Sequence, residues 1–418
     1  MRRGFLQTTT HRTVTRRTSE QSTPTVATGD KDESHVRLEI PSVPLDVGNL
    51  LPSHEAPIIC TLPPNCGPNE PVTTCLIWPS TKELILSTLG FPQAPRPPPT
   101  EPAYRLGDSP GKGLGLFATR ALKQGDLILN ERALLLTTLA PPYRRYQHGH
   151  TQFEQYMEVV VAHMPPGNKE ALMTLTNNHD GNGCGPIHGR IRTNGCSVSR
   201  LRPGKWPGLE GKYSAVLEKI SRLNHCCSPN TQSRFDRFSV SHSLFAVRDI
   251  AEGEELTNNY SNLLDSTAER AKDHRSYGRR RLKELDASAA QWIITPTYSD
   301  DWLIRKCLEQ LVIMEKENLQ AASKYLMAMT MLLIAFVCLG DSKSASVWAA
   351  RLKKLAWWGE VEHAKVDELL DPKSPAYAKR LLWRTRVDRA KGWKLFEDDA
   401  QVKRAFTEFL DPSTFEPA

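Results

Sequence analysis

A glycine-rich segment, SPGKGLGLFA at residues 109–118, is the first part of the sequence that could bind a ligand. Gly111, Gly113 and Gly115 would let the backbone approach a ligand without an intervening side chain. The spacing is not that of a dinucleotide-binding fingerprint, because the third glycine comes too early and no strand of a βαβ unit precedes it. It is not a P-loop either, because no Gly-Lys-Ser/Thr closes it. Taken alone, the segment is typical of a hairpin turn.

Two later segments carry other groups that could do chemistry. The sequence RLNHCCSPN places His225 directly before Cys226 and Cys227. Two adjacent cysteines are too close for both thiolates to chelate one ion in the ordinary way, which argues against a local zinc site. A single histidine in such a loop is more often structural than catalytic. The sequence GEELTNNY ends at Tyr260 and by itself indicates a glycine turn, a strand and an exposed tyrosine.

The elements that must position these groups can be predicted from the apolar pattern. Residues 114–136 alternate short apolar runs with glycine and polar turns, which predicts strands of a small, twisted β-sheet. A further strand is predicted over 238–247. Residues 137–192 interrupt the pattern, and within them 153–164 and 169–175 have the composition of helices.

The sequence becomes helical from Ser266 onward, with about five or six helices expected as antiparallel hairpins. Residues 325–339 form its longest apolar run, of about 15 residues, where spanning a bilayer takes about 20. Lys324 and Asp341 bound this run closely. The pattern therefore favours a buried helix over a membrane span, and no membrane association is expected.

The first 100 residues are rich in Thr, Ser and Pro, which predicts a mostly disordered region over 1–100. Within it, residues 75–90 could form one short helix that docks on the body. Residues 1–19 carry five arginines and no acidic residue. Their few sizeable apolar residues favour a disordered basic tail over a mitochondrial transit peptide.

Charge and cysteine content exclude some function classes. The chain has 54 Lys+Arg against 47 Asp+Glu and a net charge of +7, most of which lies in the basic tail. The remainder is nearly neutral, so a basic nucleic-acid-binding body is not expected. Nine cysteines without a repeating pattern argue against a small disulfide framework and favour a reducing compartment. We expect the protein in the nucleus, the cytoplasm or both, with mitochondrial targeting as a lesser alternative.

Taken in order, the segments resemble motifs of the SET-domain protein lysine methyltransferases, in particular the fungal relatives of the SET-and-MYND group. SPGKGLGLFATRAL resembles the opening glycine motif, and NERALLL the E-x-P-L strand that follows it. RTNGC at 192–196 is similar to the Thr-Asn-Gly element, SRLNHCCSPN to S-R-x-N-H-S-C-x-P-N, and FAVRDIAEGEELTNNY to A-x-R-D-I-x-x-G-E-E-x-T-x-x-Y. The resemblance covers residues 104–278 and continues loosely into the C-terminal helices.

The resemblance implies an α+β fold. A β-rich SET domain of short twisted sheets is expected over 101–265, with a helical insertion at about 137–192. An all-α, TPR-like domain is expected over 266–418, after the disordered region of residues 1–100.

The resemblance also implies an activity, namely transfer of a methyl group from S-adenosylmethionine to a lysine side chain of a protein, histone or non-histone. Because the sulfonium already activates the methyl carbon, the reaction needs no metal. Tyr260 is the implied catalytic residue, while Tyr277 and Asn259 are assigned to the substrate channel. The implied cofactor-binding residues are Lys112, Gly113, Leu114, Gly115, Asn224, His225 and Tyr260.

The sequence departs from the family in its cysteines. The MYND zinc module is missing, and Tyr277-Gly278 is followed by the basic residues 279–283, with no cysteine before Cys307. Relatives have three zinc-binding cysteines there. Cys227, at the position of their fourth ligand, therefore lacks its partners, and no zinc is expected. A zinc site made of His179, Cys184, His188 and Cys196 is conceivable but disfavoured.

Three interpretations stay open. The first is an active methyltransferase whose partner is a protein that presents a lysine. The second is a catalytically silent scaffold that binds a protein partner through its helical C-terminal domain. The third is that a cysteine-containing segment between Gly278 and Arg279 is missing from this version of the sequence only. The basic run over 270–283 is interpreted as solvated surface, so no direct nucleic-acid binding is expected.

Overall fold

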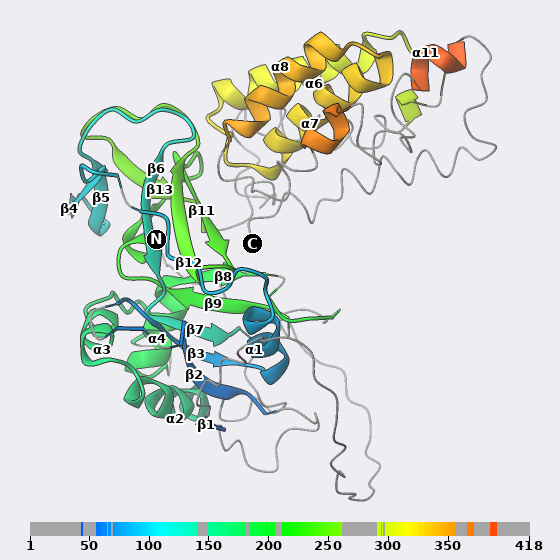
Figure 1. The fold of residues 1–418 in the computed structure, drawn as a ribbon. Helices are drawn as coiled ribbons and strands as arrows, with labels where there is room; N and C mark the ends of the chain where they lie inside the picture. The colour runs from blue at the N-terminus through cyan, green and yellow to red at the C-terminus, as the bar shows by residue number, and fades with distance from the viewer. Residues whose placement is uncertain are drawn as a thin grey trace, which may run out of the picture.

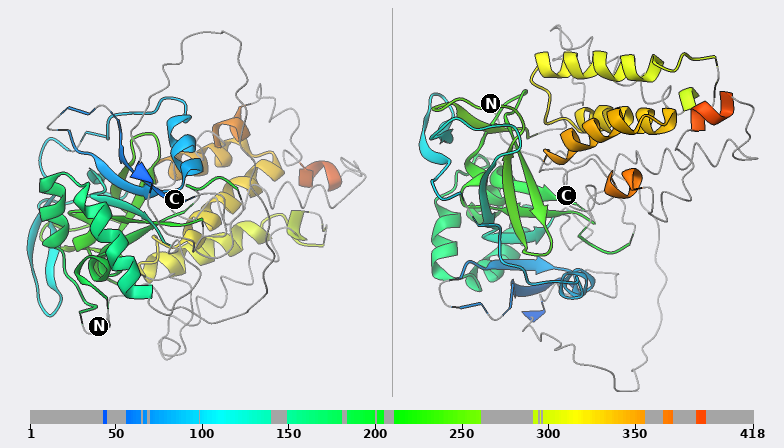
Figure 2. Two further views of the ribbon diagram at one scale, coloured as in Figure 1. Left: turned by 90° about the horizontal axis from the view of Figure 1, so that it is seen from below. Right: turned by 45° about the horizontal axis from the view of Figure 1, so that its top comes forward.

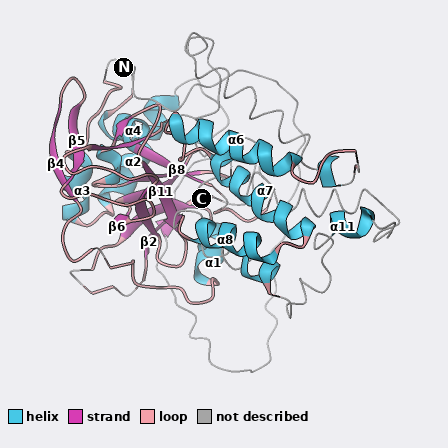
Figure 3. Cartoon of the chain, turned by 90° about the horizontal axis from the view of Figure 1, so that it is seen from above, coloured by secondary structure: helices cyan, strands magenta, loops and turns pink. Residues whose placement is uncertain are grey.

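The computed structural model describes residues 43–44, 56–64, 66–67, 70–97, 99–139, 149–180, 184–199, 201–204, 211–260, 291–293, 295, 297–355, 366–371 and 385–390. Within these ranges, a strand-rich body and a helical C-terminal part occupy different regions of the molecule (Figures 1 and 3). The mixed α+β fold predicted from the sequence, with a β-rich region ahead of a helical C-terminal part, is confirmed.

The largest sheet has six strands in the order β1-β2-β3-β7-β9-β8, with β3 and β7 parallel and the other neighbours antiparallel. Its strands are β1 (Val43–Pro44), β2 (Ile58–Leu62), β3 (Thr73–Ile77), β7 (Leu135–Thr138), β8 (Gly195–Val198) and β9 (Tyr213–Val216). Both faces are covered, since Leu76 and Leu135 face one apolar cluster while Cys75 and Leu136 face another. Strands buried on both sides lack a regular alternation of apolar and polar residues, and neither β3 (TTCLI) nor β7 (LLTT) shows one.

Within residues 1–100, which the sequence predicts to be mostly disordered, the described residues include two strands of the large sheet and a helix. Strands β2 and β3 belong to the six-stranded sheet, and β3 is buried along its whole length. The helix predicted over residues 75–90 is shorter, because Cys75 lies in β3 and the helix α1 (Pro79–Leu86) begins only after it. The basic tail lies outside the described residues.

Two smaller sheets complete the body. One has the order β10-β13-β5-β4 and the other β11-β12-β6. Their strands are β4 (Tyr104–Ser109), β5 (Gly113–Ala118), β6 (Leu127–Arg132), β10 (Asn224–His225), β11 (Thr231–Asp236), β12 (Ser241–Ala246) and β13 (Glu255–Asn258). The strands predicted over 114–136 and 238–247 are therefore present.

Three helices, α2 (Gly149–Ala162), α3 (Pro166–Met173) and α4 (Pro186–Asn194), lie within the predicted insertion and cover one face of the six-stranded sheet (Figure 1). Buried Glu154 of α2 fixes the start of α4, because its carboxylate accepts hydrogen bonds from the amides of Ile187 and His188 at 2.8 and 2.7 Å. Four amides at a helix start have no partner within the helix, and Glu154 satisfies two of them.

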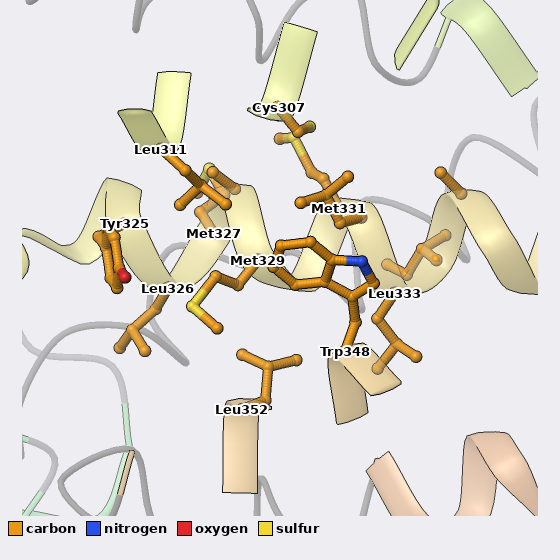
Figure 4. Packing of buried hydrophobic residues seen from close by; sticks show 14 of the residues in the cluster. Cys307, Leu311, Tyr325, Leu326, Met327, Met329, Met331, Leu333, Trp348 and Leu352 are labelled. Carbon is orange, nitrogen blue, oxygen red and sulfur yellow. The ribbon is translucent and has the colours of Figure 1, made fainter. Parts of the chain in front are cut away.

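The C-terminal part consists of α6 (Trp302–Lys316), α7 (Ser323–Leu339), α8 (Ser342–Lys353) and α11 (Thr385–Ala390) among the described residues. Helix α7 is buried along almost its whole length, which confirms the buried helix predicted over 325–339. Figure 4 shows its methionines and leucines packed between Cys307 and Leu311 of α6 and Trp348 and Leu352 of α8. No helix of the described residues has the length and hydropathy needed to cross a membrane.

The helical part packs directly on the body (Figure 2). Phe245 of β12 and the adjacent Val247 belong to the same apolar cluster as α6, α7 and α8. The Ser228 hydroxyl donates a hydrogen bond to the Glu317 carbonyl at the end of α6, at 3.0 Å. Ser228 follows the His-Cys-Cys sequence, so the helices contact the loop that leaves the candidate site.

Candidate active site

Strands β10 and β13 bring the two polar motifs side by side. They pair in parallel, with Asn224 opposite Thr257 and His225 opposite Asn258. The Cys226 amide continues the pairing by donating to the Asn258 carbonyl at 3.0 Å. Segments about thirty residues apart in the chain therefore meet at one edge of a sheet.

Asn230 holds β13 in place through hydrogen bonds to its backbone. It is 1% exposed, and its amide nitrogen donates to the Glu255 carbonyl at 2.8 Å and to a Glu254 carboxylate oxygen at 3.0 Å. Its amide oxygen accepts from the Thr257 amide at 2.8 Å. Sequence reasoning did not select Asn230, although it closes the S-P-N end of the motif.

The neighbouring carboxylate, Glu254, has a structural role. It pairs with Arg248 at 2.6 Å and accepts from the Ala251 amide at 3.1 Å. Burial opposes its ionisation, but the hydrogen bonds from Arg248, Ala251 and Asn230 outweigh this, so the pKa of Glu254 lies below its ordinary value. The R-D-I-x-x-G-E sequence thus closes the turn that leads into β13.

The glycine segment forms the tip and second strand of the β4–β5 hairpin. Gly111 and Gly113 have φ values of 73° and 81°, and a Cβ at either position would meet no atom within 4 Å. The backbone at both glycines is therefore exposed, with open space on the side where a Cβ would lie. Gly115 is the opposite case, because its Cβ would lie 2.7 Å from a Glu255 oxygen and 3.0 Å from the Asn224 amide nitrogen. A Cβ at residue 115 would therefore displace the ends of these two side chains.

Asn224 joins the hairpin to β13. It is 1% exposed, and its side-chain nitrogen donates to the Leu114 carbonyl at 3.2 Å and to Glu255 Oε1 at 2.7 Å. The other oxygen of Glu255 lies 3.5 Å from Lys112 Nζ. Sequence reasoning missed Glu255, which contacts two of the predicted cofactor-binding residues.

Tyr260 and His225 form the other half of the site. The Tyr260 amide donates to His225 Nδ1 at 3.1 Å, and the two ring centroids lie 5.3 Å apart. Because Nδ1 accepts, a neutral His225 carries its proton on Nε2, which lies 3.5 Å from Cys227 Sγ. The Tyr260 hydroxyl donates to the Leu223 carbonyl, which fixes the ring against the segment that precedes β10.

A short 3₁₀-helix, η3 (Ile220–Arg222), leads into this segment. The carboxylate of Glu131, on β6, holds its start by accepting from the amides of Lys219 and Ile220 at 3.1 and 2.6 Å. Burial raises the pKa of Glu131 to about 7 despite these bonds. Sequence reasoning did not assign Glu131 to the site.

The predicted residues fall into one connected group. Lys112, Gly113, Leu114 and Gly115 line the hairpin, Asn224 and His225 lie on β10, and Tyr260 follows β13. Asn259 lies between β13 and Tyr260, and its amide donates to the Asn258 side chain at 2.8 Å. Tyr277, predicted for the substrate channel, lies outside the described residues, as does the basic run over 279–283.

The conceivable zinc ligands have other contacts. Cys184 accepts a hydrogen bond from Arg192 at 3.1 Å, and the His188 ring lies 4.5 Å from that of Phe153. Within the described ranges, no three His, Cys, Asp or Glu side chains are placed so that they could hold a metal ion.

Comparison with known proteins agrees with this geometry. Residues 113–261 match the sequence profile of the SET domain, and this range runs from the glycine hairpin to Tyr260. The chain is also 27% identical over 169 residues to a protein of Schizosaccharomyces pombe named histone-lysine N-methyltransferase set5. The alignment covers 40% of this chain and 45% of that protein, so the chain spans less than half the length of this relative. The chain contains a SET domain and is a distant homologue of that protein.

Proposed function

We propose that the SET domain of this chain transfers a methyl group from S-adenosylmethionine to a lysine side chain of a protein substrate, histone or non-histone. The observation that carries the proposal is the parallel pairing of β10 with β13. Together with the pairing of β13 and β5, it brings the glycine hairpin, Asn224, His225 and Tyr260 close to one another, which supports a common site. The SET-domain match and the distant similarity to a named histone-lysine methyltransferase support the same activity.

The residues present fit this cofactor. Gly111 and Gly113 leave the hairpin backbone exposed, with open space where a side chain would lie, and Lys112 adds a positive charge between them. Lys112 to Gly115, together with Asn224 and His225, would hold the cofactor. When bound, S-adenosylmethionine supplies an electrophilic methyl carbon on a positively charged sulfur.

Tyr260 is the residue proposed to act at the reacting atoms. Its hydroxyl hydrogen is used in the bond to the Leu223 carbonyl, so its oxygen keeps lone pairs with which it can accept. An oriented oxygen of this kind stabilises positive charge and directs an amine hydrogen without reorganisation during the reaction. His225 holds the Tyr260 backbone, so it acts as a positioning residue.

The lysine amine must be neutral to act as a nucleophile, although the pKa of a free lysine is about 10.4. A narrow apolar channel lowers that pKa by desolvation and aligns the amine with the methyl carbon. We propose Asn259 and Tyr277 as residues of that channel.

The test is incubation of the purified full chain with radiolabelled S-adenosylmethionine, histones and a protein library. Tyr260→Phe is expected to reduce methyl transfer by about 100-fold or more, which is typical for loss of one preorganised polar group. Binding of S-adenosylhomocysteine should be reduced far less than methyl transfer, because phenylalanine keeps the aromatic ring and removes only the hydroxyl. Tyr325→Phe is the matched control, since its hydroxyl bonds to Glu315 at 2.9 Å in the helical part. Equal transfer by Tyr260→Phe and wild type would show that the assigned role is wrong.

The second candidate is a catalytically silent scaffold that binds a protein partner through its helices. The observation that favours it is the lack of any cysteine between Gly278 and Cys307, where relatives have zinc ligands. Calorimetry with S-adenosylhomocysteine separates the two candidates. Binding at micromolar concentration supports the enzyme, and its absence at several hundred micromolar supports the scaffold.

A further inference from the structure

Cys60 and Cys75 lie opposite each other on two neighbouring strands of the largest sheet. They are register partners in the antiparallel pair of β2 and β3, which lie side by side (Figure 1). Opposite residues of an antiparallel pair have Cα atoms about 4.5 or 5.5 Å apart, and both spacings fall within the range that a disulfide spans. Both cysteines are free, and among the described strands no other two cysteines face each other in this way.

The two side chains are in contact on one face of the sheet. Both belong to the same apolar cluster as Ile85 of α1. The Cys75 thiol donates a hydrogen bond to the Cys60 sulfur, so the two sulfur atoms already lie next to each other. A bond between them therefore requires rotation of the side chains and no rearrangement of the strands.

The two thiols differ in reactivity. The hydrogen bond from Cys75 and the charge of Lys82 on α1 hold the pKa of Cys60 below its ordinary value, although burial acts in the opposite direction. Burial raises the pKa of the Cys75 thiol well above its ordinary value. Because the thiolate is the nucleophile, Cys60 is expected to react first and Cys75 to react with its product.

We propose that Cys60 and Cys75 are a thiol pair that hydrogen peroxide oxidises to a reversible disulfide between β2 and β3. The Cys60 thiolate attacks one peroxide oxygen and becomes a sulfenic acid, while the O–O bond breaks and hydroxide leaves. The Cys75 thiol then attacks the Cys60 sulfur, loses its proton and displaces the sulfenic oxygen as water. In total the two thiols lose two electrons and two protons, and one peroxide is reduced to two molecules of water. A dithiol reductant reverses the reaction by exchange.

The oxidant has a route to the pair at the outer part of the sheet. Cys60 is 4% exposed and Cys75 0%. The other neighbour of β2 is β1, which pairs only with Ile58 and Ile59 among the described residues. Cys60 thus lies where β2 has no second partner strand within the described ranges, and local opening there exposes its sulfur while β3 stays paired with β7. Hydrogen peroxide is small and uncharged, so a brief opening is enough.

The experiment treats the reduced full chain with hydrogen peroxide, alkylates the remaining thiols under denaturing conditions, and analyses the tryptic peptides without reduction. The peptide of residues 38–82 contains Cys60, Cys66 and Cys75. After oxidation it should carry one alkyl group, on Cys66, and after dithiothreitol it should carry three. The disulfide closes a loop of about fifteen residues, so oxidation should also raise the melting temperature by roughly 5 °C.

Two variants sharpen the test. Cys75→Ala should show no rise in melting temperature and should leave Cys60 as a sulfenic acid that dimedone labels. Cys66→Ser is the matched control, because Cys66 lies between the pair in the chain and is partly exposed, and it should keep both the disulfide and the rise.

Three alkyl groups on the oxidised wild-type peptide, or a disulfide that includes Cys66, would overturn the proposal. An equal rise in melting temperature for Cys75→Ala and wild type would do the same. Should Cys75→Ala not fold, the position of the alkyl group in wild type and the disulfide in Cys66→Ser decide by themselves. Each of these results is independent of whether the chain binds S-adenosylmethionine.

Discussion

The candidate site and the helical part are held by different kinds of interaction. Around β10 and β13, buried Asn224 and Asn230 hold the strands through side-chain hydrogen bonds. In the helical part, α7 is enclosed by apolar side chains of α6 and α8 (Figure 4). A region that must leave open backbone for a ligand cannot fill that space with side chains, so directional bonds fix it instead. The helices have no such restriction and are stabilised by close packing.

The two regions meet through an apolar cluster and a hydrogen bond. Phe245 and Val247 extend the apolar cluster of the helices into the body, while Ser228 donates to the Glu317 carbonyl beside the site loop. Substitutions in the helical part should therefore affect mainly stability. Substitutions in the candidate site should affect both stability and ligand binding. Substitutions chosen from each region test that difference.

The largest effect on stability is expected from Leu332→Ala in α7. Leu332 is 0% exposed, and truncation of such a residue typically costs about 3 kcal/mol from lost burial and the cavity that remains. Urea unfolding followed by circular dichroism measures it. Val312→Ala, at a 63% exposed position of α6, is the control and should cost less than about 0.5 kcal/mol. Equal costs for the two variants would contradict the apolar-core account.

An intermediate effect is expected from Asn230→Ala. The change leaves the Thr257 amide and the Glu255 carbonyl without their buried partner, which costs about 2 kcal/mol. Unlike Leu332→Ala, it should also weaken S-adenosylhomocysteine binding under conditions where the chain stays folded, because β13 loses its alignment. Gln232→Ala, whose side chain bonds only to the neighbouring Ser233 carbonyl among the described residues, is the control. A folded Asn230→Ala protein with unchanged affinity would show that the alignment does not depend on this residue.

Much of the strand-rich body could be predicted from the sequence, because residues 114–136 alternate apolar runs with turn residues. The strands β2 and β3 could not. Both strands are short and largely buried, and they lie within a Thr/Ser/Pro-rich stretch. The overall composition of that stretch is typical of disorder and obscures the few apolar residues of each strand. The strand β7, which pairs with β3, begins about sixty residues after it, and no local pattern indicates that pairing.

The residues of the candidate site likewise include some that could be predicted from the sequence and some that could not. The motifs identified the glycine hairpin, Asn224, His225 and Tyr260. They did not identify Glu255 or Glu131, because the importance of each depends on a contact made across the fold. Glu255 becomes significant only once β13 lies beside β5 and β10, and Glu131 only once β6 approaches the start of η3.

A pH-dependent effect on stability is expected from Glu131→Gln. The ordinary pKa of a glutamate is 4.5, and burial raises that of Glu131 to about 7 in the folded chain. The folded state therefore holds this proton more tightly, so the associated stability is fully present below pH 4.5 and is lost as pH rises through 7. Glutamine does not titrate. Relative to wild type, Glu131→Gln should thus gain about 2.5 kcal/mol between pH 5 and pH 8.

Thermal unfolding of both proteins across that range measures the difference, in which groups common to both cancel. Buried His242, opposite Glu131 on β12, has its pKa lowered to about 3 by burial, so it stays neutral in the folded state of either protein. Glu252→Gln is the control, because Glu252 is exposed on the turn before β13. A pH-independent difference between Glu131→Gln and wild type would show that Glu131 is ionised throughout this range. The hydrogen bonds from the Lys219 and Ile220 amides would then stabilise the ionised carboxylate by more than burial destabilises it. The directional hydrogen bonds of the site region would be stronger than the raised pKa of Glu131 indicates.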